Sequence, residues 1–156
     1  MILSILSESG SEAPLVLSYV DANYWIYWFD ERLPEHDSVD YAMQKVIQDG
    51  VVVSTITLME IAHYFRIIQP KILSEKMKMI TNLSTLKLID FTSTIMQSSI
   101  NFLSIYARVG LSSRDCVILA TMKAVGSDVL LTHDKSFKKV KDIKITDEIG
   151  HRKNVY

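Results

Sequence analysis

The sequence has a single cysteine and no long apolar run, and each absence narrows the class of protein. Cys116 cannot form a disulfide within the chain, and its apolar neighbours favour packing over reactivity. No stretch reaches the roughly 18 consecutive apolar residues that indicate a membrane-spanning helix. Residues 1–10 have neither the basic start nor the long apolar core of a secretion signal. We therefore expect a cytoplasmic protein that does not enter a membrane.

Two nucleotide-binding motifs and a strong net charge are also missing. The chain contains neither G-x-G-x-x-G nor G-x-x-x-x-G-K, which argues against dinucleotide and nucleoside triphosphate binding. Its formal net charge is −1, so any binding to nucleic acid must depend on local charge. One local candidate is a lysine cluster, although such runs more often mark only a solvated surface. Its members are Lys135, Lys138, Lys139, Lys141 and Lys144.

The composition that is present is typical of one globular domain. Hydrophobic residues make up 48% of the chain and charged residues 22%, which indicates neither a disordered nor a fibrous protein. A length of 156 residues is enough for one core and too short for two ordinary domains. We expect a domain over residues 15–150, a loose lead-in over 1–14 and a tail over 151–156.

Short apolar runs alternate with helical patterns along the chain. The expected strands are 15–20, 51–56, 86–91, 129–132 and 143–146. The expected helices are 24–30, 38–49, 57–68, 70–83, 92–109 and one between Ser112 and Gly126. Strands that read as continuous apolar runs predict a parallel α/β sheet of four to five strands with helices on both faces.

The first expected helix is unusually aromatic. It contains Tyr24, Trp25, Tyr27, Trp28 and Phe29, which cover too much of a short helix for one sheet face to bury. A second apolar surface is therefore needed. Either the helix is wedged between two neighbours of its own domain, or it contacts a dimer mate or another partner protein.

Four carboxylates from distant segments are expected at one edge of the sheet. Asp21 and Asp134 end strands, whereas Glu60 and Asp115 begin helices that follow or precede strands. In a parallel sheet these positions meet beyond the carboxyl ends of the strands, where ligands bind. Asp128 begins its strand and is expected at the opposite edge.

Each of these four acids also has an ordinary structural explanation. Glu60 completes a T-x-x-E capping box with Thr57, Asp115 an S-x-x-D box, Asp21 can cap a helix and Asp134 can form a turn. Four unrelated caps have no reason to converge, however, and converging like charges oppose folding unless they are neutralised. The set therefore predicts a hard oxygen site for Mg²⁺ or Mn²⁺.

Such a site suits metal-assisted hydrolysis of a phosphodiester without a side-chain nucleophile. Asp21 and Asp134 are the expected direct ligands, and Asp115 a direct or water-mediated one. Glu60 is expected to position water or to hold a second ion. Arg114 and Lys135 flank the acids and could bind neighbouring phosphates, or they could be unspecific surface charges.

The residues around these acids resemble the PIN domain family, and within it the prokaryotic toxin ribonucleases of the VapC type. The matching segments are V-D-A-N at 20–23, S-T-I-T-L-M-E at 54–60, L-S-S-R-D-C-V-I-L-A-T at 111–121 and L-L-T-H-D at 130–134. The likeness extends over about residues 15–145. One departure from the family is His133, which stands between Thr132 and Asp134 at a position that the motif does not fix.

This resemblance implies a fold, a site and partners. It implies a sheet ordered 3-2-1-4-5 and RNA cleavage that depends on Mg²⁺ or Mn²⁺. The implied partners are a second copy of the chain and a small cognate antitoxin. The implied acidic quartet is Asp21, Glu60, Asp115 and Asp134, with Asn23 and Thr132 as supporting polar residues.

Three other functions are compatible with parts of the sequence. A non-catalytic PIN-like module that binds RNA or protein would keep the acids without activity. A phosphoacceptor receiver domain is suggested by Asp90, Thr132 and Lys144, but it needs an acidic pair after the first strand, where Asp21 stands alone. A di-iron site is suggested by Glu60-x-x-His63, but no second Glu-x-x-His occurs.

Overall fold

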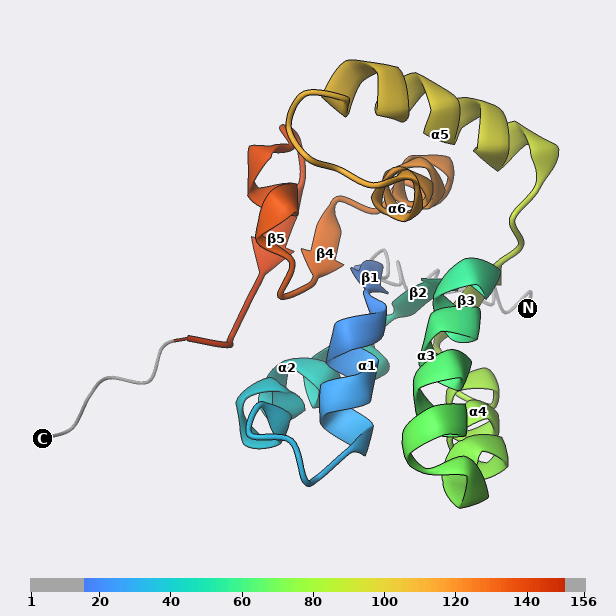
Figure 1. Ribbon diagram of the computed structural model, residues 1–156, viewed down its shortest axis with the longest axis vertical. Helices are drawn as coiled ribbons and strands as arrows, with labels where there is room; N and C mark the ends of the chain where they lie inside the picture. The colour runs from blue at the N-terminus through green and yellow to red at the C-terminus, as the bar shows by residue number, and fades with distance from the viewer. Residues whose placement is uncertain (1–15, 151–156) are drawn as a thin grey trace, which may run out of the picture.

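Five short parallel strands form the central sheet of the computed structural model, which describes residues 16–150 (Figure 1). The strands are β1 (Ser18–Val20), β2 (Val51–Ser54), β3 (Leu86–Ile89), β4 (Val129–Leu131) and β5 (Lys144–Thr146). Their order across the sheet is β3-β2-β1-β4-β5, and every neighbouring pair is parallel. This arrangement confirms the expected fold class, strand order and edge position of β3.

Helices cover both faces of the sheet (Figure 1). The α-helices are α1 (Ala22–Phe29), α2 (His36–Asp49), α3 (Thr55–Ile68), α4 (Leu73–Thr81), α5 (Ser93–Tyr106) and α6 (Ser113–Val125). The 3-10 helices are η1 (Pro70–Ile72) and η2 (Lys135–Lys139). Val51 and Val53 pack with α1 to α4, whereas Val52 packs with α6, because successive strand residues point to opposite faces. All three are fully buried, as expected for a sheet covered on both sides.

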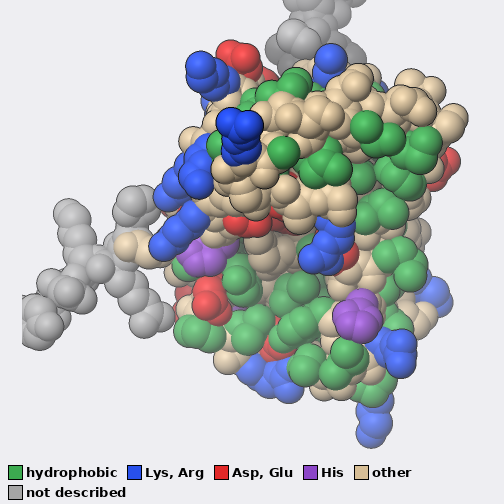
Figure 2. Space-filling model, turned by 45° about the horizontal axis from the view of Figure 1, so that its top comes forward, with side chains coloured by type: hydrophobic (Ala, Val, Ile, Leu, Met, Phe, Trp, Pro, Cys, Tyr) green, Lys and Arg blue, Asp and Glu red, His purple; other side chains and the backbone are tan. Residues whose placement is uncertain are grey.

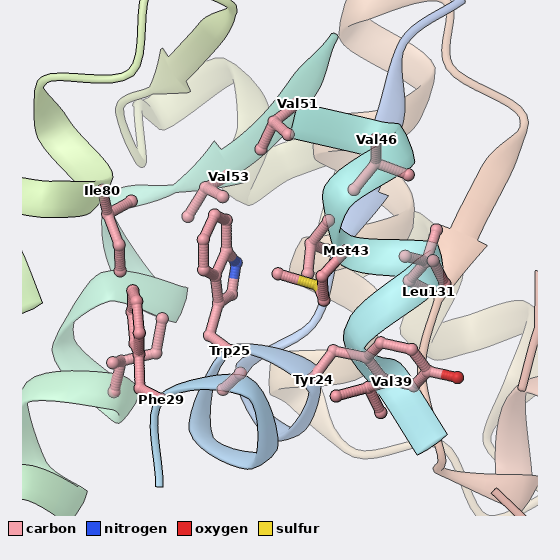
Figure 3. Close-up of a cluster of buried hydrophobic side chains, with 14 of the residues drawn as sticks. Tyr24, Trp25, Phe29, Val39, Met43, Val46, Val51, Val53, Ile80 and Leu131 are labelled. Atoms are coloured by element: carbon pink, nitrogen blue, oxygen red, sulfur yellow. The ribbon is translucent and has the colours of Figure 1, made fainter. Parts of the chain in front are cut away.

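The aromatic helix α1 is wedged between α2 and α3 of its own domain. Trp25 and Tyr24 are fully buried, and Figure 3 shows Trp25 among side chains of β2, α2 and α4. Trp28 is half-buried, and its Nε1 donates to Asp40 Oδ1 of α2 at 2.9 Å. The first of the two alternatives for this helix is therefore what the fold contains.

Helix α3 begins earlier than expected, which makes one predicted cap wrong. Its N-cap is Ser54, whose side chain accepts a hydrogen bond from the backbone N–H of Thr57 at 3.1 Å. The Thr57 hydroxyl is instead within 2.7 Å of the Tyr19 hydroxyl. Thr57 and Glu60 consequently form no capping box, and β2 ends at Ser54. Glu60 lies in the second turn of α3 and does not cap the helix.

Helix α6 has the ends that its sequence predicts. Ser112 and Asp115 form a reciprocal capping box, and Gly126 ends the helix in the left-handed conformation at φ 71°. Cys116 is fully buried, as expected for a packed side chain. Among residues 16–150, no helix is both long and apolar enough to cross a bilayer.

Some expectations concern parts of the chain beyond this description. The lead-in over 1–14, the tail over 151–156 and the start of the first strand at Leu15 all lie outside the described residues. Within residues 16–150, β1 begins at Ser18, because Ser18 is the first residue that pairs with β2 and β4.

Candidate active site at the carboxyl edge of the sheet

The structure brings the four predicted carboxylates to one pocket of about 200 Å³. It lies beyond the carboxyl ends of β1 and β4, next to the first turns of α1 and α6. Figure 2 shows acidic side chains in a hollow of this face, with Lys and Arg side chains on either side. The residues that line the pocket are Asp21, Ala22, Asn23, Glu60, Arg114, Asp115, Ile118 and Asp134.

Asp21 is the most buried of the four, with 8% of its surface exposed. It caps α1: its Oδ1 accepts from the backbone N–H of Ala22 at 2.7 Å, and its Oδ2 accepts from the Thr132 hydroxyl at 2.7 Å. Burial raises its pKa to about 6, the two hydrogen bonds oppose this rise, and the nearby Glu60 and Asp115 add to it. No side chain of a Lys or Arg among residues 16–150 forms a salt bridge with Asp21.

Glu60 reaches the pocket from α3 and forms an ion pair with Arg114 of α6. Burial raises the pKa of the Glu60 carboxyl, the Arg114 guanidinium lowers it, and Asp115 raises it again. Arg114 itself is 66% exposed at its side chain. Arg114, the one cation among the lining residues, is therefore paired with Glu60, which has the longest side chain of the four acids.

Asp115 and Asp134 are each fixed by one carboxylate oxygen. Asp115 Oδ2 accepts from the backbone N–H of Ser112 at 2.7 Å. Asp134 Oδ1 accepts from the backbone N–H and the hydroxyl of Ser136, at 2.9 and 2.7 Å. Within the described part of the chain, the second oxygens of Asp115, Asp134 and Glu60 accept no hydrogen bond. Each of these three acids thus keeps one oxygen for a ligand.

Thr132 and Asn23 link the ends of β1 and β4 through hydrogen bonds. The Thr132 hydroxyl donates to Asp21 and accepts from the backbone N–H of Asp134 at 3.0 Å. Asn23 Nδ2 lies 3.3 Å from the same hydroxyl, and Asn23 Oδ1 accepts from the backbone N–H of His133 at 3.3 Å. These bonds fix the separation of Asp21 and Asp134.

The structure adds an acid that the sequence did not reveal at this edge. His133 Nδ1 lies 3.0 Å from Asp147 Oδ1, and the His133 ring packs edge-on against Tyr27. Asp147 follows β5 directly, so the rule that placed Asp21 and Asp134 at the strand ends also applies to it. Because its carboxylate faces His133, Asp147 braces the loop that carries Asp134 rather than lining the pocket.

Helix starts converge on the same edge. Asp21 caps α1, Asp115 belongs to the first turn of α6 and Asp134 caps η2. The positive end of each helix partly offsets the negative charge of its acid. This compensation makes the cluster tolerable in the folded chain, but it does not neutralise four carboxylates.

The donor set fits a hard divalent cation. It consists of carboxylate oxygens, one of them buried with a raised pKa, and three oxygens are free to take a ligand. Within residues 16–150, no three acidic, His or Cys side chains are gathered as closely as the ligands of one ion are. The acids line the wall of the pocket instead, which is the arrangement that mutual repulsion favours.

Comparison with known proteins identifies the fold family. The family model of the PIN domain matches residues 18–143, which include all four acids. This chain belongs to the PIN domain family. No curated protein matches it significantly.

Solved structures of similar fold include prokaryotic toxin proteins. VapBC2 of Rickettsia felis, bound to a DNA fragment from its promoter, has 18% sequence identity, TM-score 0.65 and coverage of 83% of this chain and 97% of that one. VapC20 of Mycobacterium tuberculosis, a Sarcin-Ricin loop cleaving toxin, has 14% identity, TM-score 0.65 and coverage of 78% and 92%. A toxin-antitoxin complex of Klebsiella pneumoniae has 22% identity, TM-score 0.60 and coverage of 84% and 97%.

Proposed function

We propose that this protein is a cytoplasmic endoribonuclease that depends on Mg²⁺ or Mn²⁺ and acts as the toxin of a toxin-antitoxin pair. The observation that carries this proposal is the pocket in which acids from four distant segments meet. Membership of the PIN domain family and the similar fold of VapC20, which is described as cleaving the Sarcin-Ricin loop, support the nuclease class and the RNA substrate.

Asp21, Asp115 and Asp134 are the proposed metal ligands, and Glu60 positions water or holds a second ion. Bound Mg²⁺ or Mn²⁺ supplies a Lewis acid that activates water and neutralises charge on the phosphate oxygens. The chain's own part is to hold the acids in place. Thr132 and the backbone of Ala22 fix both oxygens of Asp21, while Ser112 and Ser136 each fix one oxygen of Asp115 and Asp134.

Arg114 and Lys135 are the proposed first contacts to the phosphates beside the scissile bond. Arg114 lines the pocket, and Lys135 follows Asp134 directly at an exposed position. A pocket of carboxylates repels a polyanion, so flanking cations are needed to bring RNA to it. The ion pair with Glu60 holds Arg114 at the rim, where a phosphate can compete for it.

The proposed partners are a second copy of the chain and an antitoxin protein. Similar folds are found in VapBC2 and in a complex described as toxin-antitoxin, which supports the second partner. Trp25 is fully buried within the domain, so the surface of α1 that a partner could contact is limited to its partly exposed residues, Asn23, Ile26, Tyr27 and Trp28. Light scattering on the purified chain, alone and after co-expression with a candidate antitoxin, tests both partners.

RNA cleavage by the purified protein tests the enzymatic proposal. We expect cleavage with Mg²⁺ or Mn²⁺, none with excess EDTA, and none by a folded Asp21→Asn, Asp134→Asn double variant. Asp128→Asn is the matched control, because Asp128 lies at the opposite edge of the sheet, 3.6 Å from Lys144. This control should cleave as the wild type does.

Two other outcomes would contradict the proposal. Cleavage that survives both EDTA and the double variant would place the activity at another site or in a contaminant. Absence of cleavage of several RNA classes by a protein that binds Mn²⁺ normally would favour the non-catalytic binding module.

A further inference from the structure

The lysine cluster of the sequence is divided between two edges of the sheet. Lys135 and Lys138 belong to η2, which starts at Asp134 beside the acidic pocket. Lys144 begins β5 and lies 3.6 Å from Asp128, which precedes β4, so it is at the opposite edge. Lys141 is in the loop just before β5. Five lysines that are neighbours in sequence therefore face two different environments.

The geometry of η2 sorts its residues onto three sides. A 3-10 helix has three residues per turn, so residues three apart lie on the same side. Phe137 and Val140 form the buried side, with 0% and 9% exposure. Lys139 lies on a second side, which it shares with Ser136, and its Nζ donates to the carbonyl of Val109 at 3.2 Å.

Lys135 and Lys138 form the third side of η2, and both are exposed. Their Cα atoms are about 6 Å apart along the axis of a 3-10 helix. Among the described residues, neither lysine forms a salt bridge, although Lys144 and Lys76 do. Within residues 16–150 neither ammonium group has a hydrogen-bond or salt-bridge partner, and both lysines belong to η2, the helix that starts at Asp134 beside the acidic pocket.

We propose that Lys135 and Lys138 form a binding edge for successive phosphates of a single-stranded RNA, on the side of the scissile bond that leads along η2. This inference rests on the proposed function, since it takes RNA as the ligand of the same site. It adds Lys138 to the site, and it assigns Lys139, Lys141 and Lys144 no part in binding. In this proposal the strand crosses the acids between η2 and Arg114, which also lines the pocket.

Binding without cleavage tests this edge separately from catalysis. The probe is a labelled single-stranded RNA of mixed sequence, followed by fluorescence anisotropy in EDTA over a salt series. Two double variants are compared. One carries Lys135→Gln and Lys138→Gln, and its matched control carries Lys141→Gln and Lys144→Gln. Both remove two positive charges from the same stretch of sequence, and thermal unfolding verifies that each variant folds.

The Lys135, Lys138 variant should bind RNA on the order of tenfold more weakly at low salt. The negative slope of log K against log salt should become shallower by about 1.4, which is about 0.7 for each lost phosphate contact. The Lys141, Lys144 variant should keep the wild-type slope. Equal losses in both variants, an unchanged slope in the first, or no RNA binding by the wild type would overturn the inference.

Cleavage assays with metal distinguish the two proposals. An increase in KM with little change in kcat for the Lys135, Lys138 variant supports the edge. Normal cleavage and normal RNA binding by that variant would contradict the proposed role of Lys135 and Lys138, but not the proposed nuclease activity. If the wild type binds RNA through the two lysines but never cleaves it, the nuclease proposal is contradicted and the binding role of the lysines is supported.

Discussion

The two ends of helix α1 each carry a buried aspartate, and the chain treats them in opposite ways. Asp30 ends the helix with 1% exposure, and it accepts from Arg32 through both oxygens at 2.8 Å and from the Tyr64 hydroxyl at 2.8 Å. Asp21 starts the helix with 8% exposure and has only neutral hydrogen-bond donors. The hydrogen bonds from Arg32 lower the pKa of Asp30 to about 2, whereas burial raises the pKa of Asp21 to about 6.

This difference separates a structural acid from a site acid. Asp30 is neutralised within the chain, although it lies at the unfavourable end of the helix dipole. Asp21 lies at the favourable end and still forms no salt bridge with a cation among residues 16–150, and the nearby Glu60 and Asp115 raise its pKa further. This contrast supports the proposal that Asp21 binds a cation from solution, because the chain supplies a cation to Asp30 and none to Asp21 among residues 16–150.

The largest expected effect is on activity. Asp21→Asn should reduce RNA cleavage by about 10³-fold, the scale seen when a group that stabilises transition-state charge is lost. Asp30→Asn makes the same chemical change at the other end of α1 and should leave kcat of the folded protein unchanged. Equal losses in the two variants would erase the distinction between the acids. Initial rates normalised to the folded fraction provide the measurement.

The next effect is on the stability of the metal-free protein as pH changes. The pKa of Asp21 is raised from 3.8 to about 6, so its contribution to stability is present below pH 4 and is lost as pH rises towards 6. The difference corresponds to about 3 kcal/mol. Asp21→Asn should remove this loss and unfold at higher urea concentration than the wild type at pH 7. Urea midpoints in EDTA between pH 4 and 8 measure it, and a wild type without a decline would contradict it.

Asp30→Asn should change the stability at pH 7 in the opposite direction from Asp21→Asn. It weakens charge-assisted hydrogen bonds to a buried group and should destabilise the protein by about 2 kcal/mol at neutral pH. Because the pKa of Asp30 is lowered, its contribution exists above pH 4 and disappears as pH falls through 2. The same urea series extended to acid should show the variant and the wild type converging.

The smallest expected effect concerns the link between the strand ends. Thr132→Val removes the hydroxyl that bonds Asp21 and Asp134 and should weaken Mn²⁺ binding about tenfold. Thr121→Val is the control, because Thr121 is equally buried but bonds only the carbonyl of Val117 within α6. Calorimetric titration with Mn²⁺ compares them. Similar weakening in both variants would indicate a general loss of rigidity.

Much of this arrangement follows from the sequence, because each step uses a local rule. Apolar runs predict the strands, Ser112 and Gly126 predict the ends of α6, and strand ends predict the edge at which Asp21 and Asp134 meet. The match to the PIN domain family then supports the strand order that the resemblance implied.

The remainder depends on contacts between segments distant in sequence. Ser54 rather than Thr57 caps α3 because the helix already begins at Thr55, and the Tyr19 hydroxyl, distant in sequence, lies within hydrogen-bonding distance of both side chains. The wedge of α1 between α2 and α3 and the Glu60 to Arg114 ion pair are likewise products of packing. The Asp30 to Arg32 pair is local, by contrast, and its two-residue spacing could have revealed it.

The most direct measurement is the binding of Mn²⁺ to metal-free protein at pH 7, by isothermal titration calorimetry, for the wild type, Asp21→Asn and Asp30→Asn. If Asp21 is reserved for an external cation, the wild type and Asp30→Asn bind with similar affinity, and Asp21→Asn binds at least about a hundredfold more weakly. Equal binding by Asp21→Asn and the wild type, or no binding by the wild type at millimolar Mn²⁺, would contradict this assignment.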